Sequence, residues 1–211
     1  MDWGGQFALA CCVTAAVSGA SVRAQEPTVL PLVVHTVQLG DQPVAPAEFI
    51  EQRVARANQI FAPYGVAFAI TQRAALPAKH ARLEQREDRD ALGAYVKRGA
   101  IHCFVVESLR DVDEPERMRR GVHWHSRAFA GAHFVIVSLL GGPDVLAHEL
   151  GHFLGNPEHS DTPGNLMSYE HGPELPFLDA SQRARLSRTL QRYVRSGEIR
   201  AVRAARSGPA K

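Results

Sequence analysis

Five short apolar segments predict the β-strands of this chain. β-Branched and aromatic side chains are enriched in these segments, and turn-forming residues bound them. The polar stretches between them, residues 74–89 and 110–120, predict surface loops. The predicted strands cover residues 29–37, 66–70, 101–106, 121–125 and 134–139, of which 121–125 is a short edge strand.

Apolar residues at helical spacing predict the helices. The stripe over residues 47–61 is followed by a helix-breaking Pro-Tyr-Gly sequence. Asp144 is expected to cap a second long helix, and Asp179 with Gln182 forms a capping-box pattern that begins a C-terminal helix. The predicted helices cover residues 47–61, 90–97, 145–154 and a segment that begins at Asp179.

Composition points to one globular domain. The chain has 211 residues, of which 45% are hydrophobic and 22% charged, enough for one hydrophobic core. Its net charge of +2 is too small for a nucleic-acid-binding surface, so no nucleic-acid partner is expected. We predict an α+β domain over residues 25–197, followed by a basic, flexible tail at 198–211.

The first 24 residues have the pattern of a signal peptide. An apolar run at 7–20 precedes the small-residue cleavage pattern Ser-Val-Arg-Ala, although Asp2 stands where a basic residue is usual. The run is too short to span a bilayer, so a secreted or periplasmic protein without a membrane span is expected. Removing the leader would leave Cys103, in an apolar run, as a buried thiol without a catalytic role.

The chemically informative segment is residues 148–152, which read His-Glu-Leu-Gly-His. One helical turn separates His148 from His152, so both imidazoles project from one face and can bind a single Zn²⁺. Glu149 lies beside them as a candidate general base. The apolar residues around this pattern predict a mostly buried helix, where two imidazoles need partners such as a metal.

A catalytic zinc needs a third protein ligand, and the chain must turn back to supply it. Gly155 can end the helix with a positive φ angle and redirect the backbone. Glu158 and His159 follow within reach of the metal. The stretch 148–159 resembles the long zinc motif of the metzincin metallopeptidases, whose third ligand comes three residues after the glycine, at Glu158 here.

Two assignments of the third ligand are open. A one-residue insertion around Pro157 would shift the ligand to His159, or the carboxylate of Glu158 would take its place. Imidazole is the commoner third partner in such sites, so we predict His148, His152 and His159 as the zinc ligands.

Residues 164–169 resemble the methionine-containing turn that runs beneath the zinc in metzincins. Met167 would give the ligand imidazoles an apolar floor. In some metzincins a tyrosine two residues after this methionine binds zinc or stabilises the tetrahedral intermediate, so the resemblance makes Tyr169 a candidate catalytic residue. The alternative for Tyr169 is a half-buried side chain with a satisfied hydroxyl group.

The order of predicted elements also resembles the amino-terminal half of metzincins. The resemblance implies a mixed, twisted sheet of about five strands with an active-site helix and a C-terminal helix. Together with the zinc motif, it implies a metallopeptidase that hydrolyses a peptide or protein substrate, with Glu149 taking a proton from a water that zinc activates. The strand at 121–125 could pair with an extended substrate. The alternatives are a non-catalytic zinc-binding module and a zinc hydrolase of a non-peptide amide.

The remaining histidines receive no chemical role from the sequence. His123 and His125 share one face of their predicted strand, and surface groups are favoured over a second metal site. The histidines left without a role are His35, His80, His102, His133 and His171.

Overall fold

A computed structural model of the protein describes Met1, residues 26–170 and residues 172–202. The predicted leader therefore lies, apart from Met1, outside the described residues. A six-stranded mixed sheet forms the centre of the domain, and its strands run in the order β3, β1, β5, β8, β7, with β2 paired to the end of β1. The strands are β1 (Thr28–Leu39), β2 (Gln42–Pro43), β3 (Val66–Leu76), β5 (Ile101–Val106), β7 (Gly121–His125) and β8 (His133–Ser138).

Strand direction distinguishes the two ends of the sheet. β3, β1, β5 and β8 pair in parallel, whereas β7 pairs antiparallel with β8 and forms one edge. The antiparallel edge strand is the one that the sequence predicts at 121–125. It lies beside the helix that carries the zinc motif, α3 (Val145–Phe153), and these two elements position the site.

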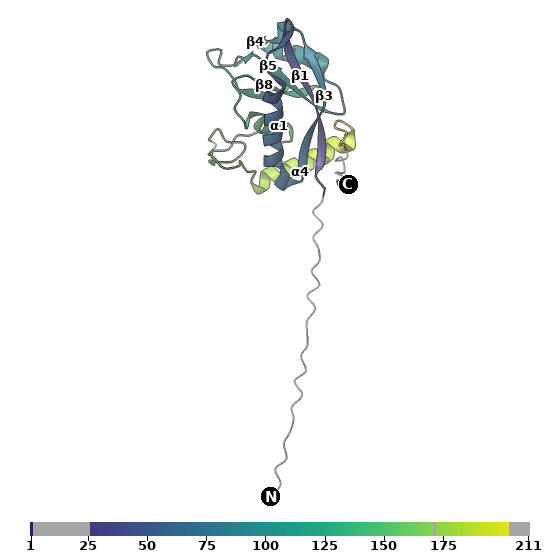
Figure 1. Ribbon diagram of the computed structural model, residues 1–211, viewed down its shortest axis with the longest axis vertical. Helices are drawn as coiled ribbons and strands as arrows, with labels where there is room; N and C mark the ends of the chain where they lie inside the picture. The colour runs from purple at the N-terminus through teal and green to yellow at the C-terminus, as the bar shows by residue number, and fades with distance from the viewer. Residues whose placement is uncertain (2–25, 171, 203–211) are drawn as a thin grey trace.

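Successive side chains along the strands point to opposite faces of the sheet, so the core has two layers. In β5, Cys103 and Val105 face one layer, and Phe104 and Val106 face the other. The first layer holds the apolar faces of α1 (Ala47–Phe61), α3 and α4 (Ala180–Ser196), and Figure 1 shows α1 alongside the strands with α4 across one end. The opposite layer is covered by two short strands, β4 (Arg82–Leu83) and β6 (Ser108–Leu109), and by α2 (Arg86–Ala91) with the 3₁₀ turn Leu92–Tyr95 that follows it. Two further 3₁₀ turns lie elsewhere, at Ala62–Tyr64 and Ala78–His80.

Three predictions about the middle of the chain are wrong. The strand predicted at 66–70 continues to Leu76, because pairing with the central strand β1 supports its polar, outward-facing second half. The segment 74–89 is accordingly not one surface loop. The helix predicted at 90–97 begins earlier, at Arg86, where Gln85 and Asp88 form a capping box, and it changes to a 3₁₀ turn after Ala91.

Of the two helix caps predicted from the sequence, the one at Asp179 is confirmed and the one at Asp144 is wrong. Asp179 and Gln182 form the predicted capping box at the start of α4. Asp144 precedes α3, but its side chain makes no cap hydrogen bond and instead pairs with Arg56 at 2.6 Å. The capping role predicted for the Asp144 side chain is therefore wrong, and its carboxylate links α3 to α1.

The packed domain extends beyond the predicted boundary at residue 197. Ile199 is buried, and the backbone N–H of Val202 donates to the carbonyl oxygen of Val29 at 2.9 Å. The residues that follow α4 are thus held against the sheet up to Val202, rather than starting a tail at 198. Among the described residues, no helix has the length and apolar character required to cross a bilayer. Cys103 is buried as predicted, and burial raises the pKa of its thiol to about 12.

Candidate metal centre and active site

Three histidines, two on one helix and one from the segment that follows it, meet at one point. His148 and His152 project from α3, and His159 comes from the segment after the helix. One nitrogen from each imidazole lies within 4.8 Å of the other two, and the Nε2 atoms of His148 and His152 are 3.1 Å apart. Tetrahedral zinc with bonds of about 2.0–2.1 Å separates its nitrogen ligands by about 3.3 Å. The group therefore fits one zinc ion.

Backbone carbonyl groups fix the orientation of the two helical imidazoles. Nδ1 of His148 donates to the carbonyl oxygen of Leu166 at 2.8 Å, and Nδ1 of His152 donates to that of Asn156 at 2.7 Å. Because a carbonyl oxygen only accepts, each Nδ1 carries the proton and each neutral ring offers the lone pair of Nε2. Burial lowers the pKa of His152 to about 4, which keeps its ring in the neutral, metal-binding form.

Glu149 is buried beside this group and is held by the edge strand. The backbone N–H of His123 donates to its carboxylate. Gly121 approaches the same side chain so closely that an added Cβ would lie 2.9 Å from Cγ of Glu149 and 2.7 Å from Cγ2 of Val145. These two contacts were not predicted from the sequence, although a glycine within a short edge strand is a signal for close approach.

Burial raises the pKa of Glu149 to about 8 in the metal-free protein, outweighing the lowering by the His123 N–H group and by Arg119. From its ordinary value of 4.5 up to about 8, the folded chain then holds a proton that the unfolded chain releases. The contribution of Glu149 to the free energy of unfolding should therefore fall as the pH rises through this window.

We expect Glu149→Gln to remove this pH dependence, because glutamine does not titrate. In metal-free protein, the thermal midpoint of the variant relative to wild type should rise by several degrees between pH 5 and pH 8. Thermal unfolding of both proteins, followed by circular dichroism, measures this difference. A constant difference across the range would show that Glu149 titrates normally.

The turn after α3 brings His159 to the helix. Gly155 has a φ angle of +97°, and a Cβ at this position would lie 2.2 Å from Oγ1 of Thr189 in α4, so glycine is required there. The imidazole of His159 lies 5.3 Å from that of His148 between ring centroids. Glu158 is exposed and does not belong to the histidine group. The geometry thus favours His159 over Glu158.

The predicted methionine turn lies beneath the helix. Met167 is fully buried, and its Sδ atom would be 2.6 Å from a Cβ added to Gly151, the residue between the two helical histidines. Tyr169 stacks against His159 at 4.5 Å, with its hydroxyl oxygen 3.5 Å from Nδ1 of that ring. The Tyr169 side chain is 72% exposed, so the alternative of a half-buried tyrosine is wrong.

A second group of three histidines lies nearby. His123 and His125 of β7 and His133 of β8 each offer a nitrogen within 4.8 Å of the others. Burial, then the neighbouring His133, His125 and His152, lower the pKa of His123. The two groups share no residue. They are nevertheless neighbours, because His152 of the first group acts electrostatically on His123 of the second.

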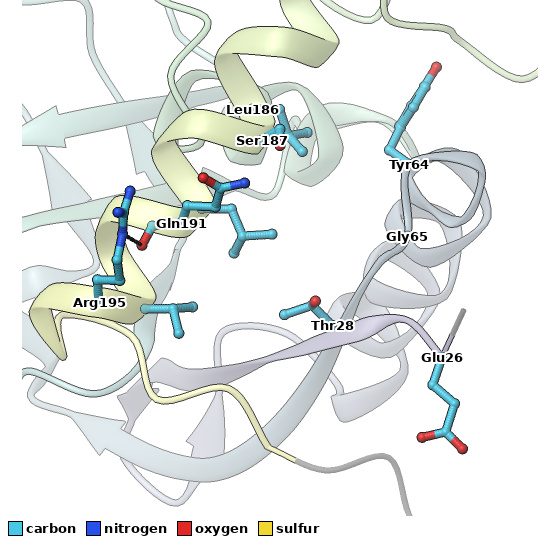
Figure 2. A pocket seen from close by; sticks show the side chains of 10 residues that line it. Glu26, Thr28, Tyr64, Gly65, Leu186, Ser187, Gln191 and Arg195 are labelled. Atoms are coloured by element: carbon cyan, nitrogen blue, oxygen red, sulfur yellow. Dashed lines mark hydrogen bonds between the residues drawn. The ribbon is translucent and has the colours of Figure 1, made fainter. Parts of the chain in front are cut away.

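A groove elsewhere on the molecule has no part in this chemistry. Figure 2 shows one wall formed by α4, with Leu186, Gln191 and Arg195, and an opposite wall that includes Thr28 and Tyr64. Among the described residues, no histidine, cysteine or aspartate lines it, and the acidic residue there is Glu26 at the rim. We assign no function to this groove.

Comparison with known proteins supports the fold. No protein-family model and no curated protein matches the sequence. The structure matches metalloproteinase-II from Bacteroides fragilis with a TM-score of 0.52 and 14% identity, over 80% of this chain and 55% of that one. It matches mature mirolysin from Tannerella forsythia, in complex with a cleaved peptide, with a TM-score of 0.55 and 13% identity, over 82% and 99% of the two chains.

A second mirolysin structure, in complex with a small compound, matches with a TM-score of 0.55 and 11% identity over the same shares, 82% and 99%. This chain therefore spans 55% of the length of the Bacteroides protein and nearly all of mirolysin. At such low identity the likeness concerns the fold alone. The predicted α+β fold, similar to that of metzincin-type metalloproteinases, is confirmed.

Proposed function

We propose that this protein is an exported, zinc-dependent metallopeptidase that hydrolyses peptide bonds. The observation that carries the proposal is the group of three imidazoles next to a buried carboxylate on the same helix. A site with three protein ligands leaves a fourth position for water or substrate, which is the arrangement of catalytic zinc. The fold of the metalloproteinases described above adds support, and the signal-peptide pattern at residues 1–24 supports export.

The donor set suits zinc better than calcium or magnesium. Imidazole nitrogen is a ligand of zinc and of other late first-row metals, whereas calcium and magnesium take oxygen ligands. In this proposal His148, His152 and His159 hold the ion. When bound, Zn²⁺ acts as a Lewis acid that makes water nucleophilic near neutral pH and polarises the scissile carbonyl group.

Glu149 performs the proton transfers. Its carboxylate accepts a proton from the attacking water and passes it to the leaving amine nitrogen. The His123 N–H group and the backbone at Gly121 hold the carboxylate in one orientation, which reduces the cost of reaching the reactive geometry. Tyr169, exposed beside His159, donates a hydrogen bond from its hydroxyl group to the carbonyl oxygen as negative charge develops there.

The edge strand β7 binds the substrate. It pairs with β8 on one side and ends the sheet, so its other edge offers backbone N–H and C=O groups to an extended peptide. This strand also contacts Glu149, so a peptide paired with β7 would run past the catalytic carboxylate. A buried general base in this position argues against a zinc-binding module without turnover.

Chelation and reconstitution test this function. A chelator should abolish hydrolysis of casein or of a quenched fluorescent peptide, and added Zn²⁺ should restore it, because the ligands form a metal-dependent site. Reversal by magnesium alone, or full activity without metal, would contradict the proposal. Zinc-dependent cleavage of small acyl amides in the absence of peptide cleavage would favour the non-peptide hydrolase instead.

A further inference from the structure

The second histidine group is built by the pairing of two strands. His123 and His125 lie two residues apart on β7 and share a face, and His125 is the register partner of His133 on β8. Phe153 of α3 stacks on His133 at 4.3 Å and lies 5.3 Å from His123, so these rings are on the α3 side of the sheet. His123 is half-buried and turned inward, which corrects its prediction as a surface group.

The rings of this group are arranged in the same general way as those of the first, with two nearly parallel and one inclined to both. His125 and His133 are nearly parallel, 5.0 Å apart at 6°, and His123 is inclined to them by 62° and 66°. At the first site, two rings are likewise nearly parallel, 5.3 Å apart at 18°, and the third is inclined to both by 84°. Both groups therefore present three imidazoles around one point.

Glu198 orients the His133 ring from outside the group. Its Oε1 atom accepts a hydrogen bond from Nε2 of His133 at 2.5 Å. Nδ1 of a neutral His133 ring then keeps its lone pair, and this atom lies 3.0 Å from Nε2 of His123. A carboxylate that holds the outer nitrogen of a ligand imidazole is a recurring feature of zinc sites.

The position of Glu198 is itself fixed by backbone hydrogen bonds. Its N–H group donates to the carbonyl oxygen of Tyr193 at 3.0 Å, and its carbonyl oxygen accepts from the N–H group of Gly99 at 2.7 Å. Phe153 and Tyr193, whose rings lie 5.5 Å apart, form an apolar wall on the inner side. The segment that carries Glu198 is therefore held in place beside His133.

From this geometry we infer a second zinc site, with His123, His125 and His133 as ligands and Glu198 as the carboxylate that orients His133. The exposed His125 ring lies on the solvent side of the group. The ion ties the edge strand β7 to β8 and, through Glu198, to the segment after α4. This site shares no ligand with the proposed catalytic centre, although the backbone N–H of His123 also holds Glu149, and zinc binding here does not depend on peptidase activity.

Zinc stoichiometry of the full chain tests the inference. Metal-free protein, loaded with Zn²⁺ and desalted, should retain about two ions per chain by mass spectrometry of the metal. His125→Gln/His133→Gln should retain about one, and so should His148→Gln/His152→Gln, which removes the other site. His80→Gln, at a histidine outside both groups, is the matched control and should retain the wild-type content.

Glu198→Gln tests whether Glu198 orients a zinc ligand, His133, or only supports the fold. The variant should fold and still reach the wild-type content at high zinc, but its second site should bind about 10- to 100-fold more weakly in a competition titration with a chelating dye. An unchanged affinity would remove Glu198 from the site. Wild-type protein that holds about one zinc, all of it lost in His148→Gln/His152→Gln, would overturn the second site while leaving the catalytic proposal intact.

Discussion

Replacing Glu149 by glutamine should lower the rate of peptide hydrolysis by about 10²- to 10⁴-fold, the usual contribution of a general base, without loss of zinc. The amide keeps the shape of the carboxylate but cannot accept the proton of the attacking water. Because Glu149 lies outside the histidine group, metal content should equal that of wild type. Steady-state kinetics on a quenched peptide, together with metal analysis of the same sample, measure both quantities.

Glu158→Gln is the matched control for this variant. It makes the same chemical change at an exposed carboxylate nearby that is not part of the histidine group, so its activity should remain close to wild type. If Glu149→Gln retained full activity, another residue would be the base. If it lost its metal, Glu149 would be acting through the site's structure rather than through proton transfer.

His159→Ala should lose zinc, whereas Glu158→Ala should keep it. Removing one of three protein ligands should weaken binding by more than the roughly 10- to 100-fold loss caused by changes outside the coordination sphere. The His159 ring is 4.9 Å from that of His152 and 5.3 Å from that of His148, which places it within the group. Competition titration with a chelating dye compares the two variants directly.

The opposite outcome would change the assignment of the third ligand. Metal-free Glu158→Ala beside zinc-loaded His159→Ala would assign the third ligand to the carboxylate, at the position that metzincins use. The fold would be unaffected, but the turn at Gly155 would have to rearrange on metal binding, since Glu158 is exposed and outside the histidine group. Both variants should be measured in the His125→Gln/His133→Gln background, so that the second inferred site does not contribute to the signal.

Local sequence determined the elements that depend on neighbours along the chain. The stripe at 47–61 forms α1, the motif at 148–152 lies on α3, and the pattern at Asp179 and Gln182 begins α4. Helical periodicity and capping involve residues three or four apart, so they can be read without knowledge of the fold. For the same reason, the spacing of His148 and His152 placed two members of the candidate metal site on one face of the helix.

Tertiary structure alone decided the features that join distant segments. Pairing with β1 extended β3 through polar residues to Leu76, and packing against the sheet ordered the chain as far as Val202. The approach of Gly121 and the His123 N–H group to Glu149 depends on how the edge strand lies against α3, which no local pattern specifies.

The second histidine group is the clearest example of a feature that local sequence patterns do not specify. The period of a strand places His123 and His125 on one face, but that face is exposed or inward according to what packs on it. His133 gains its position from strand register, and Glu198 from the backbone bonds that hold the segment after α4. The sequence by itself brought two members of the first histidine group together, because one helical turn separates His148 from His152. Only the fold could assemble the second group, because its members meet through strand pairing and packing.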